Sequence, residues 1–124
     1  MPERMRRVND ALREVVSEAI ADLKDPRIGF VTVTAVEATA DLAQATVYVS
    51  VLGSERRAQQ TVARLDAARG VIQARVNREL HLKRTPRLAF EYDRSVERGA
   101  RLAQLLDESS RARAEGDRGG DHDA

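Results

Sequence analysis

Arginine and lysine are concentrated in the second half of this 124-residue sequence. Between residues 56 and 101 there are twelve basic and five acidic side chains, an excess of seven positive charges, although the formal net charge of the chain is only +1. Residues 28 to 55 contain no lysine or arginine. Such a local excess is typical of proteins that bind a polyanion, because each neutralised phosphate releases condensed counterions. The alternative interpretation is an arginine-rich, solvated surface without a partner.

The other residue types offer no catalytic site. The two histidines, His81 and His122, lie at an expected helix-to-strand junction and in the C-terminal tail, so they form no dependable metal pair. The chain has no cysteine, no Gly-x-x-x-x-Gly-Lys phosphate loop and no Gly-x-Ser-x-Gly nucleophile turn. We therefore expect a protein that has no catalytic residues, no metal, no cofactor and no small-molecule substrate.

Length and composition favour one compact domain in a reducing, cytoplasmic compartment. The residues are 42% hydrophobic but only 3% aromatic, so the core should be aliphatic. No stretch approaches the roughly 18 to 20 apolar residues that span a bilayer, and the N-terminus does not resemble a secretory signal. We expect a monomer with a folded domain at residues 1–108. The tail at 109–124 has no large aliphatic or aromatic residue and should be disordered.

Hydrophobic periodicity predicts a domain of mixed helices and strands. Apolar residues recur at three- and four-residue steps in some segments and at alternate positions in others. The expected order is a helix at 3–23, strands at 31–35 and 43–51 that form an antiparallel hairpin, a helical segment at 55–80, a strand at 86–92 and a last helix at 95–106. In the first strand, Val31, Val33 and Ala35 should share the inward face.

The helical segment at 55–80 should bend at Ala68-Arg69-Gly70. In one straight helix Arg69 would fall on the apolar face, and Gly70 would cost about 1 kcal/mol relative to alanine. We expect Gly70 to adopt a left-handed conformation that turns the backbone. The next helix would then begin with exposed N–H groups, which suit a phosphate when arginines flank them. The alternative is that Gly70 is a tolerated kink in a helix that packs on the core.

A series of short motifs extends along the chain up to Glu108. They are Arg6-Arg7-Val8-Asn9, Asp25-Pro26-Arg27, Val31-Thr32-Val33-Thr34 with Val36-Glu37, Asp41-Leu42, Ala45-x-Val47-Tyr48-Val49-Ser50, Ala68-Arg69-Gly70, Arg84-x-Pro86-x-Leu88-x-Phe90, Tyr92-Asp93 and the Leu102 to Leu106 segment. In this order they resemble the bacterial ribosome-binding factor A family. Only the tail after Glu108 lies outside the resemblance.

The resemblance implies an α+β fold of the type II KH-like kind, arranged as helix, strand, strand, helix, kink, helix and strand, with a C-terminal helix and a disordered tail. KH domains usually hold RNA backbone with a Gly-x-x-Gly loop; here Ala68-Arg69-Gly70 takes that place. It also implies a non-enzymatic factor that binds free small (30S) ribosomal subunits and contacts 16S rRNA. That factor assists maturation of the RNA near its 5′ end and leaves before translation. Growth at low temperature often depends on the family.

We predict that cations flanking the bend and the loop after it contact RNA phosphates, with Gly70 setting the bend. The candidate RNA-binding residues are Arg57, Arg64, Arg69, Gly70, Arg75, Arg78, Lys83, Arg84 and Arg87. A secondary set in the first helix consists of Arg6, Arg7 and Arg13. Two other functions fit the sequence: a general KH-like RNA-binding protein that acts off the ribosome, and a protein-interaction module that pairs through an exposed sheet edge.

Overall fold

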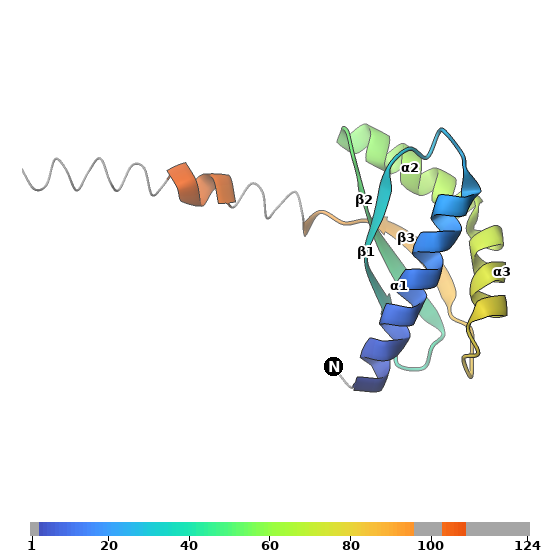
Figure 1. Ribbon diagram of the computed structural model, residues 1–124. Coiled ribbons are helices and arrows are strands. Elements are labelled where there is room, and N and C mark those ends of the chain that lie inside the picture. The colour runs from blue at the N-terminus through green and yellow to red at the C-terminus, as the bar shows by residue number, and fades with distance from the viewer. Residues whose placement is uncertain (1–2, 96–102, 109–124) are drawn as a thin grey trace, which may run out of the picture. The chain divides into compact units, whose positions relative to one another are not determined.

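The computed structural model describes residues 3–95 and 103–108, and its elements follow the predicted order (Figure 1). They are α1 (Glu3–Leu23), β1 (Val31–Ala38), β2 (Gln44–Val51), α2 (Glu55–Ala67), α3 (Arg69–Glu79) and β3 (Arg87–Tyr92). One compact unit, Met1–Asp93, contains all six. In the second unit, Arg94–Ala124, residues 103–108 are helical. The rest of the predicted last helix after Ser95, and the predicted disordered tail, lie outside the described residues.

The first helix ends where the sequence predicts, and the backbone shows how. Lys24 follows Leu23 with a φ of 51°, the left-handed conformation that commonly terminates helices. The Asp25-Pro26 dipeptide comes next, and proline disfavours helical geometry in the residue before it. On the helix itself the buried side chains recur at helical spacing and form one face: Asn9, Leu12, Val15, Val16, Ala19 and Ile20.

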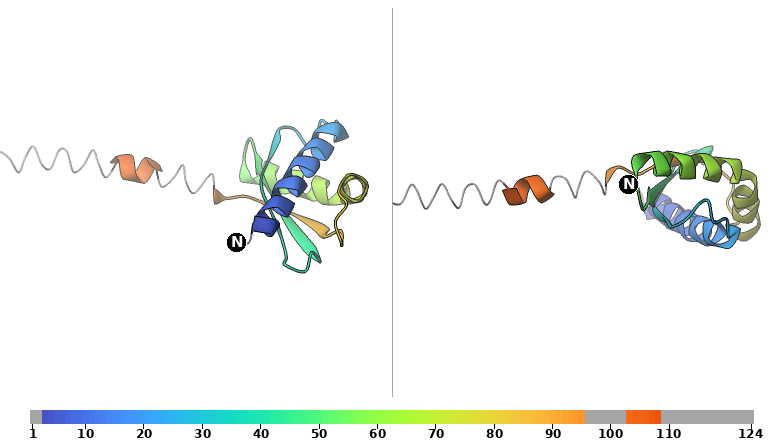
Figure 2. Two further views of the ribbon diagram at one scale, coloured as in Figure 1. Left: turned by 60° about the horizontal axis from the view of Figure 1, so that its bottom comes forward. Right: turned by 90° about the horizontal axis from the view of Figure 1, so that it is seen from above.

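The sheet has the strand order β1-β2-β3 and one buried face. β1 pairs with β2 antiparallel, as predicted, and β2 pairs with β3 parallel, so α2 and α3 form the crossover between them. Alternate residues of β2 are buried, from Ala45 to Val51. Seen from above, α1, α3 and α2 follow one another around the core (Figure 2, right). That core is aliphatic, as expected, with Phe90 as its one buried aromatic side chain among the described residues.

The first strand differs from its prediction by a β-bulge. Val33 pairs with Val49 but Ala35 pairs with Tyr48, which leaves Thr34 as one extra residue. The inward face therefore passes from Val33 to Val36 rather than to Ala35, and the strand continues to Ala38. The Thr34 hydroxyl contacts the carbonyl of Tyr48 and the carboxylate of Asp93. The prediction that Ala35 shares the inward face was wrong, because alternation breaks at a bulge.

The outer edge of β3 is covered by a side chain of α3. The Gln73 amide nitrogen donates to the carbonyl of Pro86 at 2.8 Å, and its oxygen accepts the backbone N–H of Leu88 at 3.1 Å. With these two bonds the glutamine amide pairs with a backbone carbonyl and a backbone N–H that an edge strand otherwise leaves without a partner. Leu88 and Pro86 are buried, so their backbone groups have little access to water. We call this pair of bonds the Gln73 clamp.

The Gln73 clamp should contribute measurably to stability. Replacing Gln73 with alanine leaves a buried N–H and a buried carbonyl without their partners, so we expect Gln73→Ala to lower the free energy of unfolding by about 1–3 kcal/mol. Urea denaturation measures the change. The exposed Gln60 of α2 provides a matched control, and Gln60→Ala should change the free energy by less than about 0.5 kcal/mol. Equal effects of the two substitutions would contradict the clamp.

Candidate nucleic-acid interface

The bend predicted between the two crossover helices is present at Ala68. Its backbone angles, φ −88° and ψ 2°, leave the helical range, and its N–H bonds to the carbonyls of Arg64 and Leu65 at 3.0 and 3.1 Å. Its own carbonyl accepts the N–H of Val71 at 3.1 Å and begins α3. The expectation that glycine turns the chain was wrong: Gly70 lies inside α3 and is not among the residues with positive φ.

The first turn of α3 exposes its backbone to solvent. No side chain caps this helix, and its first N–H groups, those of Arg69 and Gly70, have no intrahelical acceptor by helix geometry. Gly70 is exposed, and an added Cβ would meet no atom within 4 Å. The backbone here is therefore open to a close approach by a ligand. This is the arrangement in which a helix end and its dipole favour an anion.

Arg75 is held by three carboxylates. Its guanidinium lies 3.4 Å from Glu18 and 3.2 Å from Glu79, and it also bonds to Asp22. Only 20% of its side chain is exposed. The bond to Asp22, above the other contacts, raises the pKa of Arg75. Because Glu18 and Asp22 belong to α1, this arginine fastens α3 to α1, and the sequence had predicted it as a phosphate contact.

The other predicted cations fall into three groups along the fold. Near the α1–β1 loop, the side chain of Arg57 lies against Gly29 and Gly53, two glycines with positive φ, and the charge of Arg64 helps to lower the pKa of Asp25. The main cause of that lowering is the bond from Arg27. Arg69 and Arg78 belong to the bend and to α3. Beyond α3, the cations are Lys83, Arg84 and Arg87.

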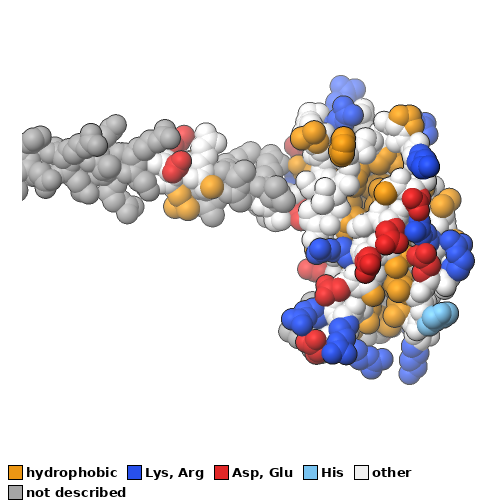
Figure 3. Space-filling model, viewed as in Figure 1, with side chains coloured by type: hydrophobic (Ala, Val, Ile, Leu, Met, Phe, Trp, Pro, Cys, Tyr) orange, Lys and Arg blue, Asp and Glu red, His pale blue; other side chains and the backbone are white. Residues whose placement is uncertain are grey.

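The secondary set in α1 divides as well. Arg6 and Arg7 are exposed and share one partner, with nitrogens 3.2 and 3.5 Å from a Glu3 oxygen. Exposed pairs of this kind contribute little. Arg13 instead lines a shallow hollow with acidic neighbours, among them Glu14 and Glu18. In the view of Figure 3, Asp and Glu side chains lie mainly across the middle of the molecule, and Lys and Arg side chains lie at its lower end, at its top and along its right side.

Sequence reasoning missed two features of this surface. Arg4, in the first turn of α1, lies near Lys83 and Arg84 across a hollow that only the folded chain creates. Phe30 follows Gly29 in the α1–β1 loop and is 86% exposed. A signal for Phe30 was available in the sequence. It is an aromatic residue directly after a glycine and just outside the alternating pattern of the strand, which indicates an exposed position.

The described residues contain neither a metal-ligand cluster nor a membrane span. No group of three or more His, Cys, Asp or Glu side chains suited to a metal occurs in 3–95 and 103–108. In the same part of the chain, no helix is both long enough and apolar enough to cross a bilayer.

The fold is that of a KH-like domain. It consists of a helix, a β-hairpin, two helices joined at a bend and a third strand parallel to the second. Ala68-Arg69-Gly70 lies at the bend. The model of the family described as ribosome-binding factor A matches residues 4–106. The chain belongs to this family.

Individual relatives agree with that assignment. The ribosome-binding factor A of Desulfitobacterium hafniense is 42% identical over 121 residues, which covers 97% of this chain and 96% of that protein. The solution structure of a Thermotoga maritima protein described as a putative ribosome-binding factor A has a TM-score of 0.68 at 32% identity, covering 73% of this chain and 89% of that one. A homology model of the Thermus thermophilus factor, fitted into the cryo-EM map of its complex with the 30S subunit, has a TM-score of 0.58 at 31% identity and covers 69% and 91%.

The position of Gly70 gives a prediction about stability. Because it has helical geometry and free space for a Cβ, Gly70→Ala should raise the free energy of unfolding by about 0.4–1 kcal/mol. The matched control is Gly53→Ala, at a φ of 124° and with the Cβ position 2.9 Å from Arg57, which should be destabilising. Thermal and urea denaturation measure both. Destabilisation by Gly70→Ala would mean that the backbone at the bend needs glycine.

The contacts of Arg75 with three carboxylates, which we call the Arg75 network, give a second prediction about stability. Replacing Arg75 with glutamine leaves three carboxylates close together, and we expect a loss of about 1 kcal/mol in the free energy of unfolding at low salt. The loss should shrink at high salt, where the carboxylates are screened from one another. Arg78→Gln, an exposed position on the same helix, is the control and should have little effect. An equal loss from both substitutions would contradict the network.

Proposed function

We propose that this protein is a non-enzymatic assembly factor that binds free small (30S) ribosomal subunits in the cytoplasm. It acts in late assembly of the subunit and assists maturation of 16S rRNA near the 5′ end. Membership in the ribosome-binding factor A family supports this function, and so does the relative placed in a 30S complex. The protein binds by contacts to rRNA phosphates.

The observation that carries the proposal is the contrast between Arg75 and the other predicted cations. Arg75 is neutralised by acids, whereas seven others make no ion pair within 4.0 Å in the described part of the chain. These seven are Arg57, Arg64, Arg69, Arg78, Lys83, Arg84 and Arg87. Charges without a protein partner are available to phosphates, and binding to phosphate releases counterions.

The bend is the proposed centre of the contact. Arg69 lies in the turn that begins α3, where Gly70 allows a phosphate to approach the backbone, and Arg78 lies in the last turn of the same helix. Arg64 and Arg57 extend the contact along α2, and Lys83, Arg84 and Arg87 extend it beyond α3. We leave Arg75 and Arg13 out of the contact because acids surround them, and we keep Arg6 and Arg7 as peripheral candidates.

Sedimentation with purified small subunits tests this function. We expect Arg69→Glu and Arg84→Glu, each alone, to weaken binding and to reduce the salt dependence of log K by about one unit per lost phosphate contact. Arg13→Glu changes the net charge equally on the acidic face of α1 and should leave binding nearly unchanged. Circular dichroism confirms that each variant is folded.

The same experiment separates the other functions. Complete ribosomes and an unrelated single-stranded RNA are included at two salt concentrations. An assembly factor should prefer free small subunits to both. Equal affinity for the unrelated RNA would favour a general KH-like RNA-binding protein, and binding without salt dependence would favour a protein-interaction module. Unchanged sedimentation of Arg69→Glu and Arg84→Glu would overturn the proposed basic surface.

A further inference from the structure

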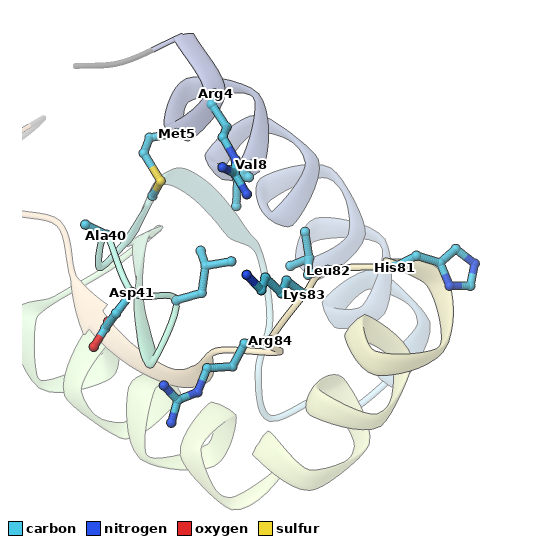
Figure 4. A pocket seen from close by; sticks show the side chains of 10 residues that line it. Arg4, Met5, Val8, Ala40, Asp41, His81, Leu82, Lys83 and Arg84 are labelled. Atoms are coloured by element: carbon cyan, nitrogen blue, oxygen red, sulfur yellow. The ribbon is translucent and has the colours of Figure 1, made fainter.

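Three segments far apart in the sequence enclose a hollow of about 840 Å³ at the end of the domain where α1 begins. They are the first two turns of α1, the β1–β2 turn and the loop between α3 and β3 (Figure 4). The volume lies within the range of about 300–1,000 Å³ that is usual for small-molecule sites. The hollow is separate from the bend between α2 and α3, and none of its lining residues belongs to that bend.

The lining combines an apolar surface with positive charge. Met5 and Val8 of α1 contribute apolar side chains, together with Leu42 and Leu82. In Figure 4, Arg4 and Lys83 point inward over the hollow, and His81 points away from it. Arg84 is the third cation in the lining. A ligand that fits must therefore carry both an apolar group and negative charge.

The one acid in the lining is already satisfied by its own turn. An Asp41 oxygen accepts the hydroxyl of Thr39 at 2.7 Å and the backbone N–H of Ala43 at 3.0 Å. The first of these bonds, with support from the second, lowers the pKa of Asp41, so the group stays ionised and fixed. Arg4, Lys83 and Arg84 make no ion pair within 4.0 Å among the residues that the structure describes. Cations therefore outnumber the single acid at the hollow.

Leu42 has a backbone conformation that leucine rarely adopts. Its φ is +57°, and its N–H bonds to the carbonyl of Thr39 at 2.8 Å to close the turn. Hairpin turns of this kind favour glycine at the left-handed position, because a Cβ is crowded there. The sequence thus keeps an unfavourable leucine where its side chain lines the hollow. Backbone strain of this kind is concentrated at binding sites.

We propose that the hollow binds one unpaired nucleotide of an RNA chain. The base packs against Leu42, Leu82 and the α1 side chains, and the adjoining phosphates contact Arg4, Lys83 and Arg84. A guanidinium plane is also a stacking partner for a base, which suits a hollow that has no aromatic side chain in its lining. An acidic peptide is the competing occupant; the match to a ribosome-binding family favours RNA, and the test below distinguishes the two. The inference rests on the proposed function and adds a base contact to its phosphate contacts.

The test uses the full chain and two short RNA probes. One is a fluorescently labelled hexauridylate, and the other is the same hexamer with an abasic ribose at all six positions. Both carry the same phosphates, so a purely electrostatic surface binds them equally. Stacking of one base should make the intact hexamer bind about tenfold more tightly in an anisotropy titration. Equal affinity of the unmodified protein for the two probes would overturn the proposal without any substitution.

Substitutions then locate the base contact. Leu42→Gly removes the apolar side chain and relieves the backbone, so we expect an unchanged or higher melting temperature together with loss of the preference for the intact hexamer. Leu52→Gly removes a leucine that is 78% exposed in the β2–α2 loop and should keep that preference. If Leu42→Gly retains the full preference, the hollow is not the base site. Displacement of the RNA by hexaglutamate at the same affinity would likewise overturn the proposal, in favour of an acidic peptide.

Sedimentation with small subunits keeps the two proposals apart. If the unmodified protein does not bind subunits, the proposed function fails, whatever the hexamers show. If it binds subunits but does not distinguish the two hexamers, only the nucleotide site fails. We expect the unmodified protein to bind subunits and Leu42→Gly to bind them more weakly, with an unchanged salt dependence, because the lost contact is apolar.

Discussion

The position of α3 depends on two side-chain contacts as well as on the hydrophobic core. Two of its residues, Ile72 and Val76, are buried in that core, and polar contacts add to their packing. The Gln73 clamp ties it to β3, and Arg75 ties it to the acids of α1. These two polar contacts extend from different sides of α3, one to β3 and the other to α1. The bend before the helix and the loop after it, with their cations, are held in place as a consequence.

The sequence was sufficient for features that depend on neighbouring residues. Apolar spacing and the Asp25-Pro26 dipeptide located α1 from Glu3 to Leu23, and alternation located most of β2 and β3. The bend was predicted because a straight helix would have placed Arg69 on the apolar face. The residue that makes the bend was not predicted correctly, since the backbone turns at Ala68 and Gly70 remains helical.

Features that join distant residues could not be predicted in this way. The bulge in β1 leaves Thr34 beside Asp93, 59 residues away, and no glycine or proline in the strand marks its position. Arg75 has the same helical spacing as the other candidate arginines, and only the packing of α1 on α3 shows that acids 53 and 57 residues away neutralise it. The hollow between Arg4, Leu42 and Lys83 likewise exists only in the fold.

The distribution of acids restricts how a polyanion can approach. Glu14 and Glu18 lie on the outer face of α1. Glu18 and Asp22, toward the end of that helix, also contact Arg75. In the proposed function, phosphates would be repelled from such a face, while the cations at the bend and at the first turn of α1 would attract them. Although the net charge of the chain is only +1, the uneven distribution of its charges would orient a polyanion on the domain. Because exposed charges are screened by salt and contribute modestly one by one, the proposed binding would be oriented in this way and still be reversible.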